Sequence, residues 1–159
     1  MIPSGWIVPL PVALPNVAWA MLPSRPAAEP DSGTSASGPR FPVLTAVLVF
    51  LERAGRIGVF VLPFFLDVDV RTDADRFCLG AAVLALGIYY LGWARYFVRG
   101  RRPELLYRSL AGIPVPLAIS PVVYFLACSG LARSIALALV TLAFGVAHVA
   151  LSVRRAGTR

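Results

Sequence analysis

Long apolar stretches that alternate with short charged ones dominate the pattern of this chain. Three of them, at 77–94, 109–132 and 134–153, contain no charged residue and are at least 18 residues long. A helix of about 20 apolar residues crosses the hydrocarbon core of a bilayer. With a fourth stretch at 41–66, the pattern predicts an all-α integral membrane four-helix bundle. The expected helices are at about 43–66, 77–98, 109–127 and 134–153.

The stretch at 41–66 differs from the others because charged residues interrupt it. At about 100° per residue, Glu52 and Arg56 fall on one helical stripe and Arg53 lies at its margin. A charge at mid-bilayer costs roughly 2.5–3.5 kcal/mol on insertion scales, although pairing and snorkelling reduce that cost. This helix can therefore lie in the interface, or span the bilayer with its charged stripe toward protein or water.

The N-terminal segment 1–22 carries no charge but contains several prolines, among them Pro9, Pro11 and Pro15. A proline in a helix interior costs about 3 kcal/mol because it removes a donor and clashes with the preceding turn. We expect an interfacial or re-entrant segment, with a signal peptide or a full span as alternatives. Residues 23–40 are rich in Pro, Ser and Gly, which predicts a flexible linker before the transmembrane domain at 41–159.

Composition agrees with lipid as the solvent, since the chain is 58% hydrophobic and 14% charged. A soluble domain has about 45–50% apolar and about 25% charged residues. The net charge is +7, which could suit a nucleic acid, but the arginines flank the apolar stretches. We therefore expect no nucleic-acid partner and interpret the charge as a topology signal.

The distribution of charge along the chain predicts an orientation. The 67–76 loop is acidic, whereas 95–108 and the C-terminal tail are rich in arginine. Cytoplasmic loops carry an excess of basic residues. We expect a multi-pass protein of the bacterial inner (plasma) membrane with a cytoplasmic C-terminus. Four arginines could also bind anionic lipid head groups, although topology explains them equally well. They are Arg95, Arg99, Arg101 and Arg102.

A proline-rich segment precedes and enters the third expected span, where a substrate or ion path is one hypothesis. Broken backbone at membrane depth must be buried in protein or line a wet cavity, as it does in transporters. The alternative is that the first prolines lie in the first turn and that only the last one kinks the helix. The residues concerned are Pro114, Pro116, Ser120 and Pro121.

The last expected helix carries its polar residues, Thr141, His148 and Ser152 among them, on one stripe. Lipid would penalise such a stripe, so we expect it to face the bundle. It is either a packing seam with one hydrogen-bonded histidine or part of a proton-linked or metal-linked site, although one histidine alone makes a weak metal site. The hypothesis of a polar intramembrane cluster covers both the charged stripe of 41–66 and the polar stripe of 134–153. Its members are Glu52, Arg53, Arg56, Thr141, His148 and Ser152.

No pattern in the sequence indicates a metal or another cofactor. The two cysteines, Cys78 and Cys128, are 50 residues apart, and no Cys/His ligand spacing or Ser–His–Asp set is present. Under the expected topology both cysteines lie near the outer leaflet. They are ordinary apolar cysteines or, alternatively, a disulfide.

Four strings of the sequence together resemble an uncharacterised family of small four-helix bacterial integral membrane proteins. The resemblance implies a membrane bundle and no activity, and it carries no catalytic residue. The strings are LERAGRIGVFVLPFF (51–65), GWARYFVRGRRPELLYR (92–108), GIPVPLAISPVVYFL (112–126) and FGVAHVALS (144–152).

These features of the sequence leave three classes of function open. The first is a non-catalytic membrane protein that acts through lipids, a homo-oligomer or a membrane protein partner. The second is a small oligomeric channel or transporter that uses the proline-rich break and His148. The third is a membrane-embedded enzyme that uses Glu52, Asp67 or His148, which requires these groups to converge on one reacting centre.

Overall fold

The fold is known from a computed structural model, which describes residues 3–22, 42–106 and 115–157. Every regular element in these ranges is a helix, as expected for the all-α class. The α-helices are α1 (Leu10–Met21), α2 (Pro42–Val61), α3 (Asp73–Val98), α4 (Pro116–Leu131) and α5 (Ile135–Gly157). Three short 3-10 turns accompany them: η1 (Ser4–Ile7), η2 (Leu62–Phe65) and η3 (Pro103–Leu106).

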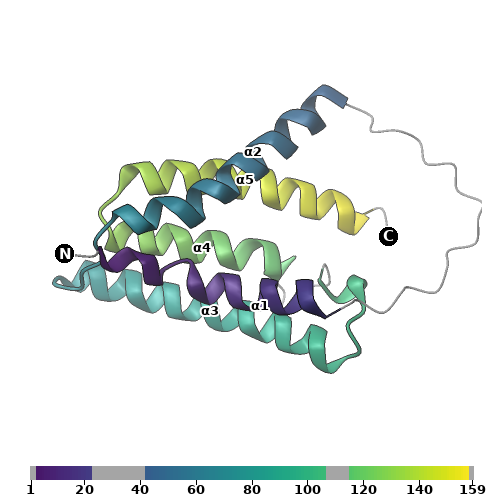
Figure 1. Ribbon diagram of the computed structural model, residues 1–159, viewed down its shortest axis with the longest axis horizontal. Coiled ribbons are helices and arrows are strands. Elements are labelled where there is room, and N and C mark those ends of the chain that lie inside the picture. The colour runs from purple at the N-terminus through teal and green to yellow at the C-terminus, as the bar shows by residue number, and fades with distance from the viewer. Residues whose placement is uncertain (1–2, 23–41, 107–114, 158–159) are drawn as a thin grey trace, which may run out of the picture.

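The long helices pack in the order α2–α5–α4–α3, each against the next. Figure 1 shows α1 running alongside α3, and the first half of α2 leaning away from the bundle. The apolar side chains of that half, such as Val43 and Val47, are exposed. Two helices, Asp73–Val98 and Ile135–Arg154, are long and apolar enough to cross a membrane. Helix α4 is shorter, with 16 residues. Helix α2 is long enough but carries the charged stripe of Glu52, Arg53 and Arg56.

The helix boundaries correct several expected ones. The helix predicted at 109–127 is observed at Pro116–Leu131, with Pro116 in its first turn, where a missing N–H costs nothing. Residues 107–114, and with them Pro114, lie outside the described part of the chain. Helix α5 continues to Gly157, past the expected end at 153, because arginine and alanine favour the helix.

The N-terminal segment contains a helix that the prolines did not lead us to expect. Pro11 lies in the first turn of α1, where it is tolerated, and Pro15 lies inside the helix. Pro15 cannot donate to the carbonyl of Pro11, and the hydroxyl of Tyr90 on α3 donates to it instead at 2.9 Å. A neighbouring helix therefore supplies the donor that the proline removes, as membrane helices require.

Two more tyrosine hydroxyls hold this segment against the bundle. Tyr124 on α4 donates to the carbonyl of Val8 at 2.8 Å, and Tyr89 on α3 donates to the carbonyl of Val12 at 3.2 Å. Val8 and Val12 are buried in the core. The N-terminal segment thus packs as a further helix, with its carbonyls bonded to tyrosines of α3 and α4.

Close contact between α2 and α5 depends on Gly55. A Cβ atom at this position would lie 2.7 Å from the Cβ atom and 2.9 Å from the Cα atom of Phe144. Real carbon atoms do not approach that closely, so only glycine allows the two backbones to lie at this separation. Small residues serve the same purpose where membrane helices cross.

Charges collect at the two ends of the bundle. One end holds the loop before α3 and the α4–α5 turn, with Asp67, Asp69 and Asp75. The opposite end holds the α3 C-terminus and the end of α5, with Arg99, Arg154 and their neighbours. The middle of the bundle carries few charges, and the most central ones are those of α2.

Candidate functional site

The most central charges in the bundle form a small cluster between α2 and α5. The carboxylate of Glu52 forms an ion pair with the guanidinium of Arg56 one turn along α2. The same oxygen, Oε1, lies 3.1 Å from Nδ1 of His148 on α5. The side chains of Glu52 and His148 are 13% and 23% exposed. One carboxylate therefore serves two basic partners in a largely buried position.

The crossing at Gly55 explains why these residues meet. Helices α2 and α5 run in opposite directions (Figure 1). Glu52 is one turn before Gly55, and His148 is one turn after Phe144, the residue that Gly55 touches. Both therefore lie on the same side of the crossing. The imidazole also stacks on the Phe144 ring, with centroids 4.9 Å apart and planes 17° apart, which fixes its orientation.

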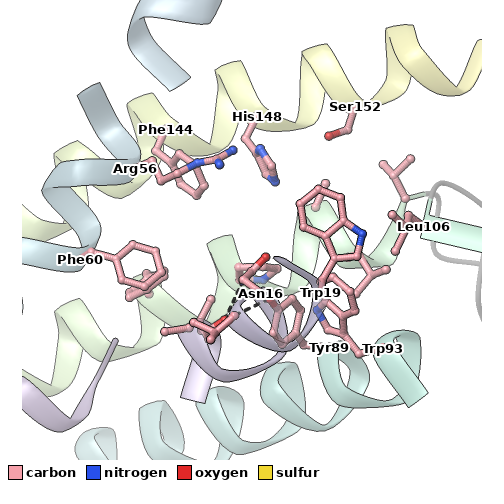
Figure 2. A pocket seen from close by; sticks show the side chains of 18 of the residues that line it. Asn16, Trp19, Arg56, Phe60, Tyr89, Trp93, Leu106, Phe144, His148 and Ser152 are labelled. Atoms are coloured by element: carbon pink, nitrogen blue, oxygen red, sulfur yellow. Dashed lines mark hydrogen bonds between the residues drawn. The ribbon is translucent and has the colours of Figure 1, made fainter. Parts of the chain in front are cut away.

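A cavity of about 550 Å³ adjoins this cluster. Ligand pockets for small molecules have about 300–1,000 Å³. All five α-helices contribute to the lining, and Figure 2 shows two unlike walls. The α2 and α5 wall presents the polar groups of Arg56, His148 and Ser152 beside the rings of Phe60 and Phe144. The opposite wall, from α1, α3 and α4, is largely aromatic and aliphatic. It includes Val12, Trp19, Tyr89, Trp93, Leu117 and Phe125.

Asn16 is the main polar group of the apolar wall. Its Nδ2 atom donates to the Val12 carbonyl and to the Tyr89 hydroxyl, both at 2.7 Å (Figure 2). The first bond holds the side chain against α1 itself, and the second joins α1 to α3. The indole Nε1 of Trp93 is buried near the same hydroxyl, and within the described ranges it has no hydrogen-bond partner, although buried polar atoms usually have one.

Of the remaining residues of the predicted polar cluster, Ser152 lines the cavity, whereas Arg53 and Thr141 do not. Arg53 is exposed and does not line the cavity. Thr141 is fully buried, and its hydroxyl donates to the Leu137 carbonyl of its own helix at 2.7 Å. Ser152 is buried and lines the cavity one turn beyond His148. The structure thus brings together Glu52, Arg56 and His148, with Ser152 nearby.

The predicted substrate or ion path along the proline-rich segment is only partly at the cavity. All three described residues of this segment are buried, and of them Pro121 lines the cavity, whereas Pro116 and Ser120 do not line it. Pro121 lies inside α4, where it cannot donate to the carbonyl of Leu117, another lining residue. The break therefore contributes one edge of the cavity.

The four arginines considered for lipid binding lie together where α3 ends. Arg99 and Arg102 are exposed, whereas Arg95 and Arg101 are half-buried. The guanidinium of Arg95 donates to the Leu105 carbonyl at 3.2 Å, so it ties α3 to η3. Arg101 has a left-handed φ of 58°.

The cysteines and the acidic residues form no further site. Cys78 and Cys128 are both free thiols, and within the described ranges no three His, Cys, Asp or Glu side chains gather in a way that could hold a metal ion. Asp67 accepts from the Ser4 backbone N–H at 3.2 Å, at the acidic end of the bundle. It does not join Glu52 and His148, so the three groups considered for an enzyme do not converge.

Sequence reasoning missed the contribution of α1 and α3 to the cavity. Asn16 carried a usable signal, because it is the only asparagine of the chain and is surrounded by apolar residues. Tyr89 and Trp93 belong to an aromatic cluster that is equally typical of a membrane interface. Only the docking of α1 on α3 gives these side chains a common cavity.

Comparison of the chain with protein-family models, with curated proteins and with solved structures gave no match.

Proposed function

We propose that this chain is a non-catalytic multi-pass membrane protein that binds a small amphipathic molecule in the cavity beside Glu52 and His148. Two apolar helices of sufficient length support membrane embedding. The exposed apolar side chains on the outside of α2, α3 and α5 support it too, since water would penalise them and lipid would not. With the basic end in the cytoplasm, as the arginine distribution favours, the cavity belongs to the inner-leaflet half of the bundle.

The contrast between the two cavity walls carries the proposal. An amphipathic molecule could place its apolar body against Trp93 and Phe125 and its polar group toward Arg56 and His148. The volume of about 550 Å³ suits a compact or single-chain amphiphile. Such pockets combine a mainly apolar lining with a few polar groups that orient the ligand.

Quenching of Trp93 fluorescence tests the proposal directly. Trp93 lines the cavity and is 6% exposed, so brominated molecules in the surrounding bilayer would reach it poorly. The chain has three tryptophans. A Trp6→Phe, Trp19→Phe background leaves Trp93 as the single fluorophore and keeps an aromatic ring at position 19, which also lines the cavity. In nanodiscs, a single-chain amphiphile with a brominated chain should quench Trp93 saturably.

A matched pair of variants distinguishes cavity binding from partition into lipid. Ala13→Phe adds a ring inside the cavity and should weaken the quenching. Ala94→Phe adds the same ring to an exposed position of α3 that does not line the cavity, and it should leave the quenching unchanged. Quenching that rises linearly with probe and is equal in both variants would refute the proposed function.

The Glu52–His148 contact favours a second candidate, a proton-linked carrier. Ionisable groups within a membrane protein mark ion or substrate pathways more often than chance. This pair joins two helices beside the cavity. Reconstituted liposomes with a pH-sensitive dye inside should then show a proton flux that occurs only when the transported solute is present. Loss of flux in Glu52→Gln and His148→Ala would support this candidate, and no flux of any solute tested would remove it.

A further inference from the structure

We propose that the molecule bound in this cavity carries an acidic group, a carboxylate or a phosphate monoester, that the guanidinium of Arg56 receives beside His148. This inference rests on the proposed amphiphile-binding function and specifies its ligand. It specifies the polar group of the ligand, which depends on the wall formed by α2 and α5. The apolar wall does not determine that group.

Among the described residues that line the cavity, the charged side chains have one sign of charge. Apart from the phenol of Tyr89, the ionisable ones in these ranges are Arg56 and His148, both bases. The acid that pairs with them, Glu52, is not among the lining residues. A molecule inside the cavity thus meets the basic groups, while the carboxylate contacts them from α2, outside the lining. An anionic group is favoured there, and a cationic one is not.

Arg56 has capacity for a second acceptor. A guanidinium offers five N–H donors in a planar fork that matches carboxylate or phosphate oxygens. The bond to Glu52 uses Nη2, and the contacts within the described ranges give no other partner for this side chain. The Arg56 side chain is 55% exposed, so the remaining donors are accessible to a ligand in the cavity.

The arrangement around Glu52 also favours an added anion. One carboxylate oxygen contacts both Arg56 and His148, so these two bases share one carboxylate. The guanidinium of Arg56 also faces the cavity. An acidic group of a ligand there would form a charge-assisted hydrogen bond with it.

The experiment compares probes that differ only in the head group. In the Trp93-only background in nanodiscs, the probes are a dibrominated long-chain fatty acid, the alcohol of the same chain and the phosphate monoester of that alcohol. Both acidic probes should reach half-maximal quenching at a concentration at least about tenfold lower than the alcohol, since a hydrogen bond to a charged group is typically worth that much. Inorganic phosphate without a chain should not displace them.

Three variants locate the effect at Arg56. Arg56→Gln should abolish the preference for the acidic probes, whereas Arg53→Gln removes an exposed arginine of the same helix outside the cavity and should keep it. Arg56→Lys, which retains a charge, should keep part of the preference if Arg56→Gln proves unstable. Glu52→Gln should strengthen the preference, because it releases Arg56 from its carboxylate.

The possible failures are distinct. Equal, saturable quenching by the acids and the alcohol would overturn the acidic-group inference and leave amphiphile binding intact. No saturable quenching by any probe would overturn both. Full displacement by inorganic phosphate would show that a free anion occupies the site, and would also overturn the inference.

Discussion

Nδ1 of His148 lies 3.1 Å from Oε1 of Glu52, and this contact joins residues 96 positions apart in the chain. It is the polar counterpart of the Gly55–Phe144 approach one turn away. The glycine sets the distance between α2 and α5, and the ion cluster sets their register. Both features would have to be lost together if the two helices slid past each other by one turn.

A double-mutant cycle should detect coupling between Glu52 and His148. Either alanine substitution leaves the other group half-buried and without this partner, which typically costs about 1–3 kcal/mol. The double variant should therefore be less destabilised than the sum of the two, with a coupling energy of about 0.5–3 kcal/mol. Denaturant unfolding in one detergent measures all four proteins, with Arg53→Ala as the exposed control. If the two losses in the free energy of unfolding were strictly additive, the contact would contribute nothing to stability.

The substitution Gly55→Ala should separate α2 from α5. The added Cβ would contact backbone atoms of Phe144, which cannot move without moving α5. We expect a loss of a few kcal/mol, as for other overpacked positions, and weaker quenching of Trp93 by cavity probes. Gly87 provides the matched control, because a Cβ there meets no atom within 4 Å. Gly87→Ala should be neutral or stabilise the helix by up to about 1 kcal/mol, and equal behaviour of the two variants would contradict the close approach.

Periodicity along the sequence was enough to place Glu52, Arg56 and His148 on stripes of two helices, because helical geometry is local. It could not show that the two stripes meet, since that depends on which helices are neighbours. The pairing of α2 with α5 follows from the packing at Gly55, which the sequence does not distinguish from the other glycines. The helix in the N-terminal segment was harder to predict from the sequence, because prolines disfavour a helix when no neighbouring group replaces the missing donor. In helix α1 an external donor, the hydroxyl of Tyr90, bonds to the carbonyl that Pro15 leaves without a helical partner.

Removing the hydroxyl of Tyr124 should loosen the N-terminal segment. Tyr124→Phe leaves the Val8 carbonyl without this donor in a buried position, and the expected cost is about 1–3 kcal/mol. Tyr90 is 39% exposed, so water or a lipid head group can replace its bond to Pro11, and Tyr90→Phe should cost less. Proteolysis of the N-terminal segment in detergent measures the difference. Faster cleavage in Tyr90→Phe than in Tyr124→Phe would contradict this ranking.

Asp75 should make the acidic end of the bundle sensitive to low pH. It lies in the first turn of α3, before the uncharged stretch that begins at residue 77. Backbone N–H groups of Thr72 and Arg71, the Thr72 hydroxyl and the Arg133 charge lower its pKa from 3.8 to about 2. The carboxylate is thus protonated more readily in the unfolded chain than in the folded one.

The sign of the effect follows from that difference. The stabilisation by Asp75 is complete above about pH 4 and is lost as the pH falls toward 2. Asp75→Asn should therefore lower the melting temperature at pH 6 and flatten its decline between pH 4 and pH 2. Asp73→Asn is the control, since its ion pair with Arg76 is exposed and such pairs contribute little. A parallel decline in wild type and Asp75→Asn would exclude the capping carboxylate as the cause.

Cysteine labelling in sealed inverted and right-side-out vesicles tests the orientation on which the cavity's placement depends. In a background with Cys78 and Cys128 replaced by alanine, single cysteines at Arg99 and at Val70 report the two ends of the bundle, because both positions are exposed and lie at opposite ends of α3. A membrane-impermeant maleimide should label Arg99→Cys only from the cytoplasmic side, since basic segments are retained there, and Val70→Cys only from the opposite side. Labelling of both from one side would mean that α3 does not cross the bilayer. Labelling of Arg99→Cys from the outside alone would invert the protein and put the cavity in the outer leaflet, where the ligand would have to enter from the other side of the membrane.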